Sequence, residues 1–353
     1  MTKLSPLSKK QEGEMRRLQV TGGSTYIVSL PKKWVTKNQL KKGSLLLISE
    51  EENGSLAVSS QNALTTEKSA GDALIKVSSN DNPNTIVRKT VSAYLVGYNM
   101  IRMKTQEHQQ MTSKQRNTIK DFARRLLVGT EIVTDTPTEL ILQVLLSYPE
   151  LSIQSALRRM CIITSSMHKD ALTALKELDS QLAKGVVATD DEVDRFNLYV
   201  VRQLKVAIQN PRIIREIGLK NARDCLGYRQ VTKSVERVAD HAASIAENVL
   251  LLKKPIDEEI LKNVEEMSNI AVSLFETAID SLFRLDFNLA ESVIQKTKDV
   301  SFPMKEALLS SKKVGTEEVA NLRLVIESLR RTAEYASDIA EIVLNMTVET
   351  IVE

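Results

Sequence analysis

The sequence predicts a multidomain α+β protein with a small β-rich first domain, a small α+β middle domain and an all-α second half. Strand-like segments separated by short turns fill roughly the first sixty residues. Strand-like and helical segments then alternate, and from about residue 150 nearly every segment has the apolar spacing of a long amphipathic helix. We therefore expect a polar tail at 1–14 and domains at 15–60, 72–147, 150–252 and 255–348.

The composition is that of an ordinary soluble protein. Of the 353 residues, 42% are hydrophobic, 26% are charged and only 4% are aromatic, which favours packing of aliphatic helices. Cys161 and Cys225 lie in helical apolar patterns, so a disulfide framework is not expected. The first residues are polar, and no apolar run reaches the length of about 18 residues that spans a bilayer. We expect a cytoplasmic protein that is peripheral to a membrane at most.

The first domain is expected to contain two strand pairs and one short helix. RRLQV and TYIVSL are strand-like and flank the turn TGGS, and the helix PKKWVTKNQL begins at Pro31 and ends before Gly43. SLLLISE and LAVSS flank Asn53-Gly54, which is a strong hairpin signal. A unit of about fifty residues cannot easily bury a core of its own, so we expect it to dimerise.

Positive charge is concentrated in this first domain. Between Met15 and Ile48 the sequence has seven Lys and Arg residues and no Asp or Glu, although the net charge of the whole chain is only +3. Basic side chains neutralise DNA phosphates and hydroxyl groups assist them, but a solvated basic surface on a dimerisation module explains the charge equally well. The candidate DNA-binding residues are Arg16, Arg17, Ser24, Thr25, Lys32 and Lys33.

The segment from about Arg16 to Ser59 resembles the AbrB/SpoVT type of swapped-hairpin DNA-binding domain. The resemblance lies in a strand, a GGS loop, and the segments YIVSLPKKWV and LKKGSLLLI. It implies an intertwined homodimer whose basic residues contact DNA. Some members of this family serve instead as dimerisation or antitoxin modules, and the resemblance covers both roles.

The middle domain is expected to have the order β-α-β-α-β-β, after a polar linker at 61–71. ALIKVSS and NMIRMK are strand-like, a helix begins near Asn84, and Thr112 or Ser113 can cap a second helix. TEIVTDTPTELILQVLL predicts two strands around a Thr-Pro turn. The domain has no metal-ligand spacing, nucleophile elbow or phosphate loop, so a linking, ligand-sensing or dimer-forming role stays open.

The helical half contains an internal repeat. LDSQLAKGVVATDDEVDRF, from Leu178, is similar to LDFNLAESVIQKTKDVSFP, from Leu285. SIAENVL, from Ser244, is similar to DIAEIVL, from Asp338. Each copy is expected to form three helices, and two such copies pack as tandem bundles. The expected helices are 150–178, 180–208 and 211–252 in the first copy, and 257–285, 287–312 and 315–348 in the second.

Two acidic pairs in the first copy are candidate metal ligands. Asp190 and Asp194 are four residues apart, as are Glu236 and Asp240, so both carboxylates of each pair lie on one helix face. Four oxygen donors on adjacent helices suit Mg²⁺, Mn²⁺, Ca²⁺ or iron. A solvated polar face with Lys or Arg neighbours is the simpler interpretation of the residues alone, because the acidic strip lies off the apolar stripe. His241 is expected at the boundary of the strip rather than as a ligand.

This helical half resembles the PhoU family of phosphate-uptake regulators. DDEVD, at Asp190–Asp194, and ERVADHAASIAE, at Glu236–Glu247, are similar to two helix motifs of that family. Joined to the AbrB-like domain, they resemble the archaeal form of such regulators. The resemblance implies tandem three-helix bundles, phosphate-linked control of uptake, and a divalent or trivalent metal cation (iron, Mg, Mn or Ca) held by the acidic pairs. It also implies the ATPase of a phosphate ABC transporter, or another phosphate-signalling protein, as a partner.

The second repeat departs from the acidic pattern. Arg330 stands at the position of Glu236, and Glu334 stands at the position of Asp240. Glu334 and Asp338 still form an E-x-x-x-D pair, displaced by one turn, and are secondary candidates for metal ligands. Arg330 beside Glu334 can instead make a metal-free ion pair. On the other helix, Thr297 and Ser301 stand where Asp190 and Asp194 stood.

Three functions are consistent with the sequence. The favoured one is a DNA-binding transcriptional regulator of phosphate uptake with a metal-binding helical sensor domain. The alternative is a regulator of a phosphate ABC transporter that does not bind DNA and uses its first domain only for dimerisation. The third is a metal-dependent enzyme such as a phosphatase, which the sequence disfavours because no nucleophile or substrate-positioning group accompanies the carboxylates.

Overall fold

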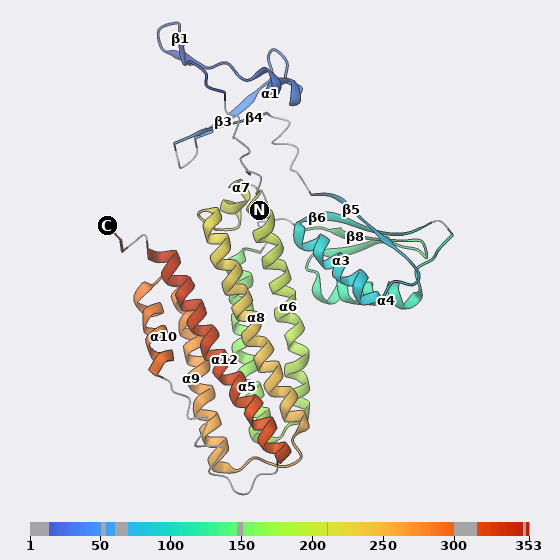
Figure 1. The fold of residues 1–353 in the computed structure, drawn as a ribbon, viewed down its shortest axis with the longest axis vertical. Coiled ribbons are helices and arrows are strands. Elements are labelled where there is room, and N and C mark those ends of the chain that lie inside the picture. The colour runs from blue at the N-terminus through green and yellow to red at the C-terminus, as the bar shows by residue number, and fades with distance from the viewer. Residues whose placement is uncertain are drawn as a thin grey trace, which may run out of the picture. The chain divides into compact units, whose positions relative to one another are not determined.

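The computed structural model divides the chain into two compact units, residues 1–69 and 70–353 (Figure 1). The structure describes residues 14–50, 54–60, 70–106, 108–146, 151–209, 211–299, 316–348 and 351–352. The predicted tail, apart from its residue 14, the predicted linker from 61 to 69 and Asn53 lie outside the described residues. No helix in the described part of the chain is long and apolar enough to cross a membrane.

The first unit contains two antiparallel strand pairs and one short helix, as predicted. β1 (Gln19–Thr21) pairs with β2 (Thr25–Ile27), and β3 (Leu46–Glu50) pairs with β4 (Leu56–Ser60). α1 (Lys32–Lys37) lies between the two pairs in the chain and follows Pro31. Gly22 and Gly23 take the positive φ angles of the first turn. Among the described residues of this unit, only Ser60 is buried.

The second unit begins with a four-stranded sheet that carries two helices. The elements are β5 (Ala70–Val77), α3 (Pro83–Val96), β6 (Tyr98–Thr105), α4 (Ser113–Leu126), β7 (Thr130–Asp135) and β8 (Glu139–Val144), in the predicted order. The strand order in the sheet is β5-β6-β8-β7, with β5 parallel to β6 and the other pairs antiparallel. Asn82, one of the polar residues near Asn84, caps α3, and Thr112 caps α4 in a capping box, both as predicted.

The helical part contains α5 (Ile153–Glu177), α6 (Ser180–Ala207), α7 (Pro211–Glu216) and α8 (Ala222–Leu251), followed by α9 (Glu258–Arg284), α10 (Phe287–Asp299) and α12 (Thr316–Thr347). The prediction of one helix over 211–252 is wrong. The chain breaks between α7 and α8, where Gly218 takes φ +84° and the Asn221 side chain caps α8. The part of the predicted helix 287–312 that follows Asp299 lies outside the described residues.

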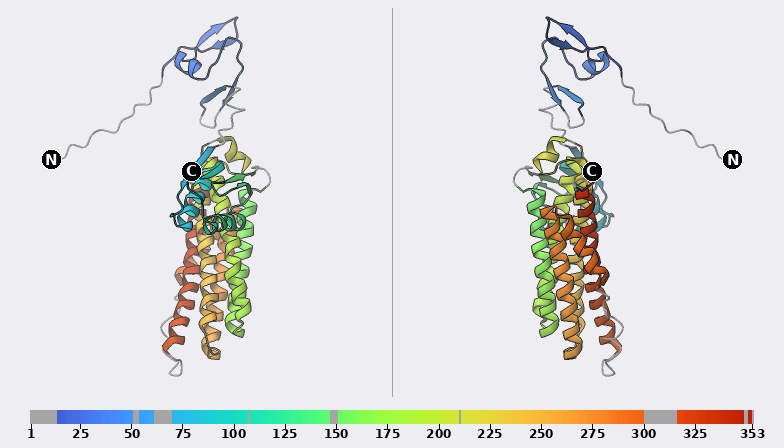
Figure 2. Two further views of the ribbon diagram at one scale, coloured as in Figure 1. Left: turned by 90° about the vertical axis from the view of Figure 1, so that its right-hand side faces the viewer. Right: turned by 90° about the vertical axis from the view of Figure 1, so that its left-hand side faces the viewer.

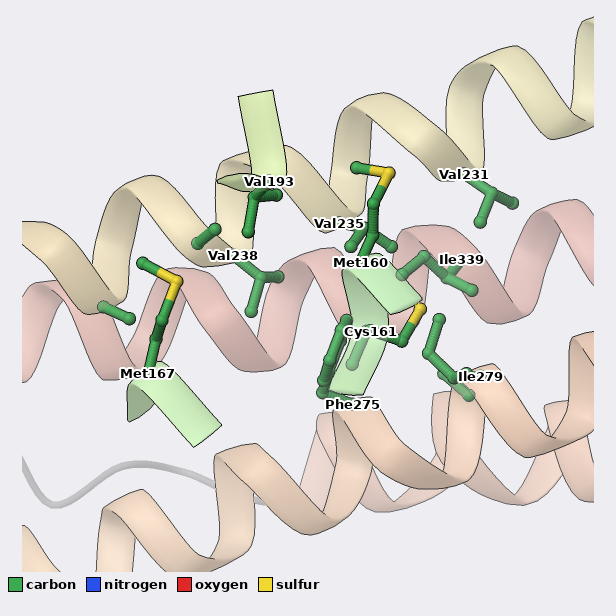
Figure 3. Close-up of a cluster of buried hydrophobic side chains, with 14 of the residues drawn as sticks. Met160, Cys161, Met167, Val193, Val231, Val235, Val238, Phe275, Ile279 and Ile339 are labelled. Carbon is green, nitrogen blue, oxygen red and sulfur yellow. The ribbon is translucent and has the colours of Figure 1, made fainter. Parts of the chain in front are cut away.

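The two bundles share one hydrophobic core. α8 and α12 pack along each other, and α5 packs against α9 as well as against α6 and α8. Figure 3 shows Met160 and Cys161 of α5 in contact range of Val235 of α8, Phe275 of α9 and Ile339 of α12. The apolar faces that the helical periodicity predicted are therefore buried against helices of both repeats.

The sheet and its helices are attached to the bundle through α6. α3 and α4 both pack against α6, as the views in Figures 1 and 2 agree. Arg202 of α6 is 3% exposed and contacts the carbonyl oxygen of Tyr94. Its guanidinium donates further hydrogen bonds to the carbonyls of Gly97 and Tyr98 at 3.1 and 3.0 Å, and to Asn99 Oδ1 at 2.8 Å. These acceptors lie where α3 ends and β6 begins, so one buried cation joins the two layers.

Candidate metal site and DNA-binding surface

The predicted metal ligands of the first bundle lie on two helices that pack along each other. α6 carries Asp190 and Asp194, and α8 carries Glu236 and Asp240. Each pair is separated by about one helical turn, so its two carboxylates lie on one face of their helix. The charges of Glu236 and Asp240 act on both aspartates of α6, so the structure places the four groups near one another along these two helices.

The two aspartates of α6 have strongly raised pKa values. Partial burial, followed by the negative charges of Asp194, Asp240 and Glu236, raises the pKa of Asp190 to about 7. Burial, followed by the charges of Glu236 and Asp240, raises the pKa of Asp194 to about 6, while Lys233 acts in the opposite direction. A bound cation would favour the ionised form of both groups and remove this repulsion.

Asp190 and Asp194 are acidic residues of α6 that have no counter-charge among the described residues. Neither makes a hydrogen bond or an ion pair with any side chain in the ranges that the structure describes. Their neighbour Asp191 pairs with Arg125 of α4 at 3.2 Å and so faces the α+β layer instead. The α6 carboxylates are therefore available as ligands without the loss of an existing bond.

The carboxylates of α8 already have cationic partners on their own helix. Lys233 Nζ contacts Glu236 Oε2, and Arg237 Nη1 lies 3.1 Å from Asp240 Oδ2. Arg237 Nε also lies 4.0 Å from Glu236 Oε2. Sequence reasoning did not identify these two cations individually. A signal was present, because Lys233 and Arg237 each precede an acidic residue by three positions on the helix.

The donor set fits a hard cation in type and charge, although its side chains do not converge on one point. No group of three His, Cys, Asp or Glu side chains among the described residues is arranged to hold a metal ion. The carboxylate oxygens of Glu236 and Asp240 point to Lys233 and Arg237 instead. Carboxylates are the ligands that Mg²⁺, Mn²⁺ and Ca²⁺ prefer. Coordination by all four residues requires the α8 side chains to turn toward α6.

In the second bundle, arginine side chains pair with two of the acidic residues of α12. Arg330 contacts Glu334, as the ion-pair interpretation predicted, and lies 2.6 Å from Glu327. Burial raises the pKa of Asp338, and the charges of Glu341 and then Glu334 add to the effect. Thr297 of α10 donates its hydroxyl to the Val293 carbonyl at 2.8 Å, and Ser301 lies outside the described residues.

His241 lies at the contact between α8 and α12. Its ring stacks on Tyr335 with 5.9 Å between the ring centroids and 30° between the planes. Burial lowers the pKa of His241, and the charge of Arg331 lowers it further. The side chain is therefore packed between the repeats, in agreement with the boundary position expected from the sequence.

The candidate DNA-binding residues all lie on exposed parts of the first unit. Arg16 and Arg17 precede β1, Ser24 and Thr25 are at the β1–β2 turn, and Lys32 and Lys33 begin α1. Arg16 contacts Glu14, an acidic residue just outside the acid-free window. The hairpin of β1 and β2 extends away from α1 within this unit (Figure 1), so one copy of the unit presents these residues on separate elements.

Two concave surfaces flank α5 and do not include the carboxylate cluster. One, of about 410 Å³, lies between α5 and α9 and is lined by residues that include Cys161, Lys169 and Glu276. The other, of about 420 Å³, lies between α5 and α6 and includes Thr189 and Glu192. Neither of these two surfaces contains any of the four predicted metal ligands.

Comparison with known proteins identifies two families. The PhoU domain model matches residues 157–249 and 264–343, which correspond to the two repeats. The model described as "Antidote-toxin recognition MazE, bacterial antitoxin" matches residues 19–64. A PhoU homolog of Clostridium acetobutylicum, called a phosphate-specific transport system accessory protein, is 21% identical over 197 residues. That alignment covers 54% of this chain and 88% of the relative. The homolog of Aquifex aeolicus is 28% identical over 132 residues, which are 37% of this chain and 57% of the relative.

Two solved structures are similar to the helical half. PhoU from Pseudomonas aeruginosa is 24% identical, with a TM-score of 0.49, and covers 56% of this chain and 96% of its own length. The phosphate transport system regulatory protein PhoU from Streptococcus pneumoniae is 17% identical, with a TM-score of 0.47, and covers 57% and 96%.

Proposed function

Since the chain is a PhoU-family protein with a MazE/AbrB-type domain at its N-terminal end, we propose that it is a DNA-binding regulator of phosphate uptake. The main support for this proposal is that a PhoU domain and a MazE/AbrB-type domain occur in one chain. The PhoU family is one of regulators and not of enzymes, as the sequence indicated. We place its action in the cytoplasm, with a phosphate ABC transporter ATPase or another phosphate-signalling protein as the partner of the helical half. The archaeal origin stays a prediction.

The state of the first unit supports a homodimer. Only Ser60 is buried among its described residues, whereas Leu18, Val20, Tyr26, Leu45 and Leu47 are all exposed. Exposed apolar side chains on this scale have no core to join within one copy. Intertwining of two copies would bury them and would bring the basic residues of both copies to one surface. A charged surface of that kind binds duplex DNA through its phosphates.

Genome-wide mapping of bound DNA in phosphate-replete and phosphate-starved cells tests the DNA role. We expect enrichment upstream of phosphate-transport genes, with a dependence on phosphate supply. In vitro, we expect a mobility shift of such a duplex that weakens with salt and disappears in Lys32→Glu/Lys33→Glu. Lys253→Glu/Lys254→Glu, an equal charge change at an exposed lysine pair of the second unit, is the control and keeps the shift.

The alternative is a regulator of a phosphate transporter that does not bind DNA. The exposed apolar side chains of the first unit favour it equally, because dimerisation alone would cover them. In that case no DNA region is enriched in either condition, while the oligomeric state still depends on the first unit. DNA mapping and the mobility shift therefore separate the two functions, because both functions predict the dimer and only one predicts DNA binding.

The metal role of the first bundle is a second part of the proposal. It is supported by the raised pKa values of Asp190 and Asp194 and by the absence of a counter-charge for either within the described residues. Metal analysis of wild type against Asp190→Asn/Asp240→Asn tests it. We expect the wild type to retain a cation after dialysis and the double variant to lose it. Equal metal content in the two proteins would contradict the proposal that these carboxylates bind a metal ion.

A further inference from the structure

The acidic side chains of the two bundles are paired with cations to different extents. In the second bundle, Arg330 Nη2 and Nε lie 2.6 and 2.9 Å from the two carboxylate oxygens of Glu327, and Nη1 contacts Oε1 of Glu334. Arg331 Nη1 lies 2.8 Å from the other oxygen of Glu334. All four oxygens of the two glutamates therefore have a cationic partner, whereas Asp338 has none among the described residues. Hydrogen bonds between charged groups of this kind are among the stronger ones in proteins.

The first bundle is less completely satisfied. Lys233 and Arg237 contact only Oε2 of Glu236 and Oδ2 of Asp240, and leave the second oxygen of each carboxylate without a cationic partner among the described residues. Asp190, on the neighbouring helix α6, has no hydrogen-bond or ion-pair partner among the described residues. Four carboxylates therefore face two cations in the first bundle, which leaves room for the charge of one divalent ion.

We infer that Arg330 is a built-in cation that takes the place of a metal ion beside Glu327 and Glu334, so that of the two acidic clusters in the described residues only that of the first bundle binds metal. This inference rests on the metal binding proposed above. Arg330 stands where the first repeat has Glu236, so one residue both removes a ligand and supplies a positive charge. A guanidinium stays charged at every accessible pH and is attached to the chain, so a dissolved cation competes poorly with it.

The inference predicts that one substitution opens a metal site in the second bundle. Arg330→Glu places a third carboxylate about one turn before Glu334 and about two turns before Asp338, on the same face of α12. It also removes the guanidinium that contacts both Glu327 and Glu334. Carboxylates grouped in this way on one helix face are hard oxygen donors suited to Mn²⁺.

The test measures Mn²⁺ bound to the full-length chain after chelation and equilibrium dialysis. The background is Asp190→Asn/Asp240→Asn, which silences the first bundle. We expect Arg330→Glu in that background to bind one more Mn²⁺ per chain than the background alone. Arg284→Glu is the control, because Arg284 makes a similar pair with Asp280, at 2.8 Å and four residues apart, on α9. The control is expected to leave the metal content unchanged.

A folded Arg330→Glu variant that binds no additional Mn²⁺ overturns the inference. Failure of the proposed site in the first bundle is seen separately, as equal metal content in wild type and Asp190→Asn/Asp240→Asn. If Arg330→Glu does not fold, Arg330→Gln is used with melting temperature as the readout. In chelator, we expect Arg330→Gln in the Asp190→Asn/Asp240→Asn background to have a lower melting temperature than that background alone. On addition of Mn²⁺, we expect the melting temperature of Arg330→Gln to rise by more. Equal rises in the two proteins overturn the inference as well.

Discussion

Asp190 and Asp194 are partly buried carboxylates of the helical half whose charge is not compensated by a described side chain. Both are partly buried, both face the carboxylates of α8, and neither has a partner within the described residues. Burial and like charge both disfavour the ionised form, so the folded protein holds protons on these groups that it would otherwise release. The physical cost of this arrangement in the metal-free protein is a reason to expect a bound cation in the functional one.

The raised pKa values predict how stability depends on pH in the chelated protein. The unfolded Asp190 titrates near its ordinary value of about 4, and the folded one titrates at about 7. Between these values the folded state binds more protons, so the free energy of unfolding falls as pH rises. We expect Asp190→Asn to flatten this fall and to stabilise the protein at about pH 7.5 by on the order of 1 kcal/mol, after a discount for partial exposure.

Urea denaturation at about pH 5 and about pH 7.5, both in chelator, measures this effect. The control is Asp121→Asn, which removes an exposed carboxylate of α4 far along the chain from the cluster. The same pH slope in wild type and Asp190→Asn would contradict the assignment of the raised pKa to that residue.

At the scale of elements, two contacts decide how the helices are placed. Arg202 ties α6 to the end of α3 through several acceptors in a buried environment. Gly227 allows α8 to approach α12, because a Cβ at this position would lie 2.8 Å from Met346 Sδ and 3.3 Å from Ile342 Cγ2. The first contact is polar and the second is steric, and both join elements that are distant in sequence.

Arg202→Met is expected to weaken the joint between the layers. The substitution keeps much of the aliphatic volume but leaves the carbonyls of Tyr94, Gly97 and Tyr98 without their guanidinium donor. We expect a loss of about 3 kcal/mol in the free energy of unfolding. Arg125→Met, which removes the exposed pair with Asp191, is the control and is expected to cost less than about 1 kcal/mol. Similar losses in urea denaturation would argue against a special role for Arg202.

Valine at two helical glycines separates packing from helix propensity. At Gly227 the new side chain meets Met346 and Ile342, so we expect a loss of about 1–3 kcal/mol. At Gly185 of α6 an added Cβ meets nothing within 4 Å, so we expect no loss and a small gain from propensity. Thermal denaturation of the two variants measures the difference. A stable Gly227→Val would show that α8 and α12 are packed less closely than the structure has them.

At the scale of the whole molecule, the two units differ in how complete they are. The second unit has two hydrophobic clusters, one in the bundle and one under the sheet. The described part of the first unit has no buried apolar side chain. A folded domain without a core is stable only when another surface covers it, and a second copy is the simplest such surface.

A change of one exposed leucine tests the source of the dimer. Leu47 of β3 is 46% exposed in the single copy, and Leu47→Asp is expected to shift the molar mass in light scattering from dimer toward monomer. Leu74 of β5 is 59% exposed and belongs to the second unit, so Leu74→Asp is the control and keeps the mass. A dimer that survives Leu47→Asp but dissociates in Leu74→Asp would place the interface on the sheet instead.

Much of this architecture could be predicted from periodicity and local signals. The strand pairs, the caps near Thr112 and the repeated helices follow from short-range patterns that each act within a few residues. The break between α7 and α8 was missed because the apolar periodicity runs on through it, although Gly218 and the Asn221–Asp224 capping box are local signals of a helix end and a helix start. The acidic pairs could be found by spacing, and the three-residue spacing of Lys233 before Glu236 and of Arg237 before Asp240 indicates their partners as well. Which carboxylates stay unpaired could not be predicted, because the burial of Asp190 and Asp194 depends on how α6 packs against α8.

The core shared by the two bundles bears on how the protein is made. A nascent chain that has emerged as far as α8 holds the long helices α5, α6 and α8 of the first repeat, yet Met160 and Cys161 still lack Phe275 of α9 and Ile339 of α12, which belong to the same core (Figure 3). These apolar faces stay uncovered until the last helix leaves the ribosome, and over that interval they are open to chaperones. Synthesis of α12, rather than completion of the first bundle, is therefore the step that closes the interior of this protein.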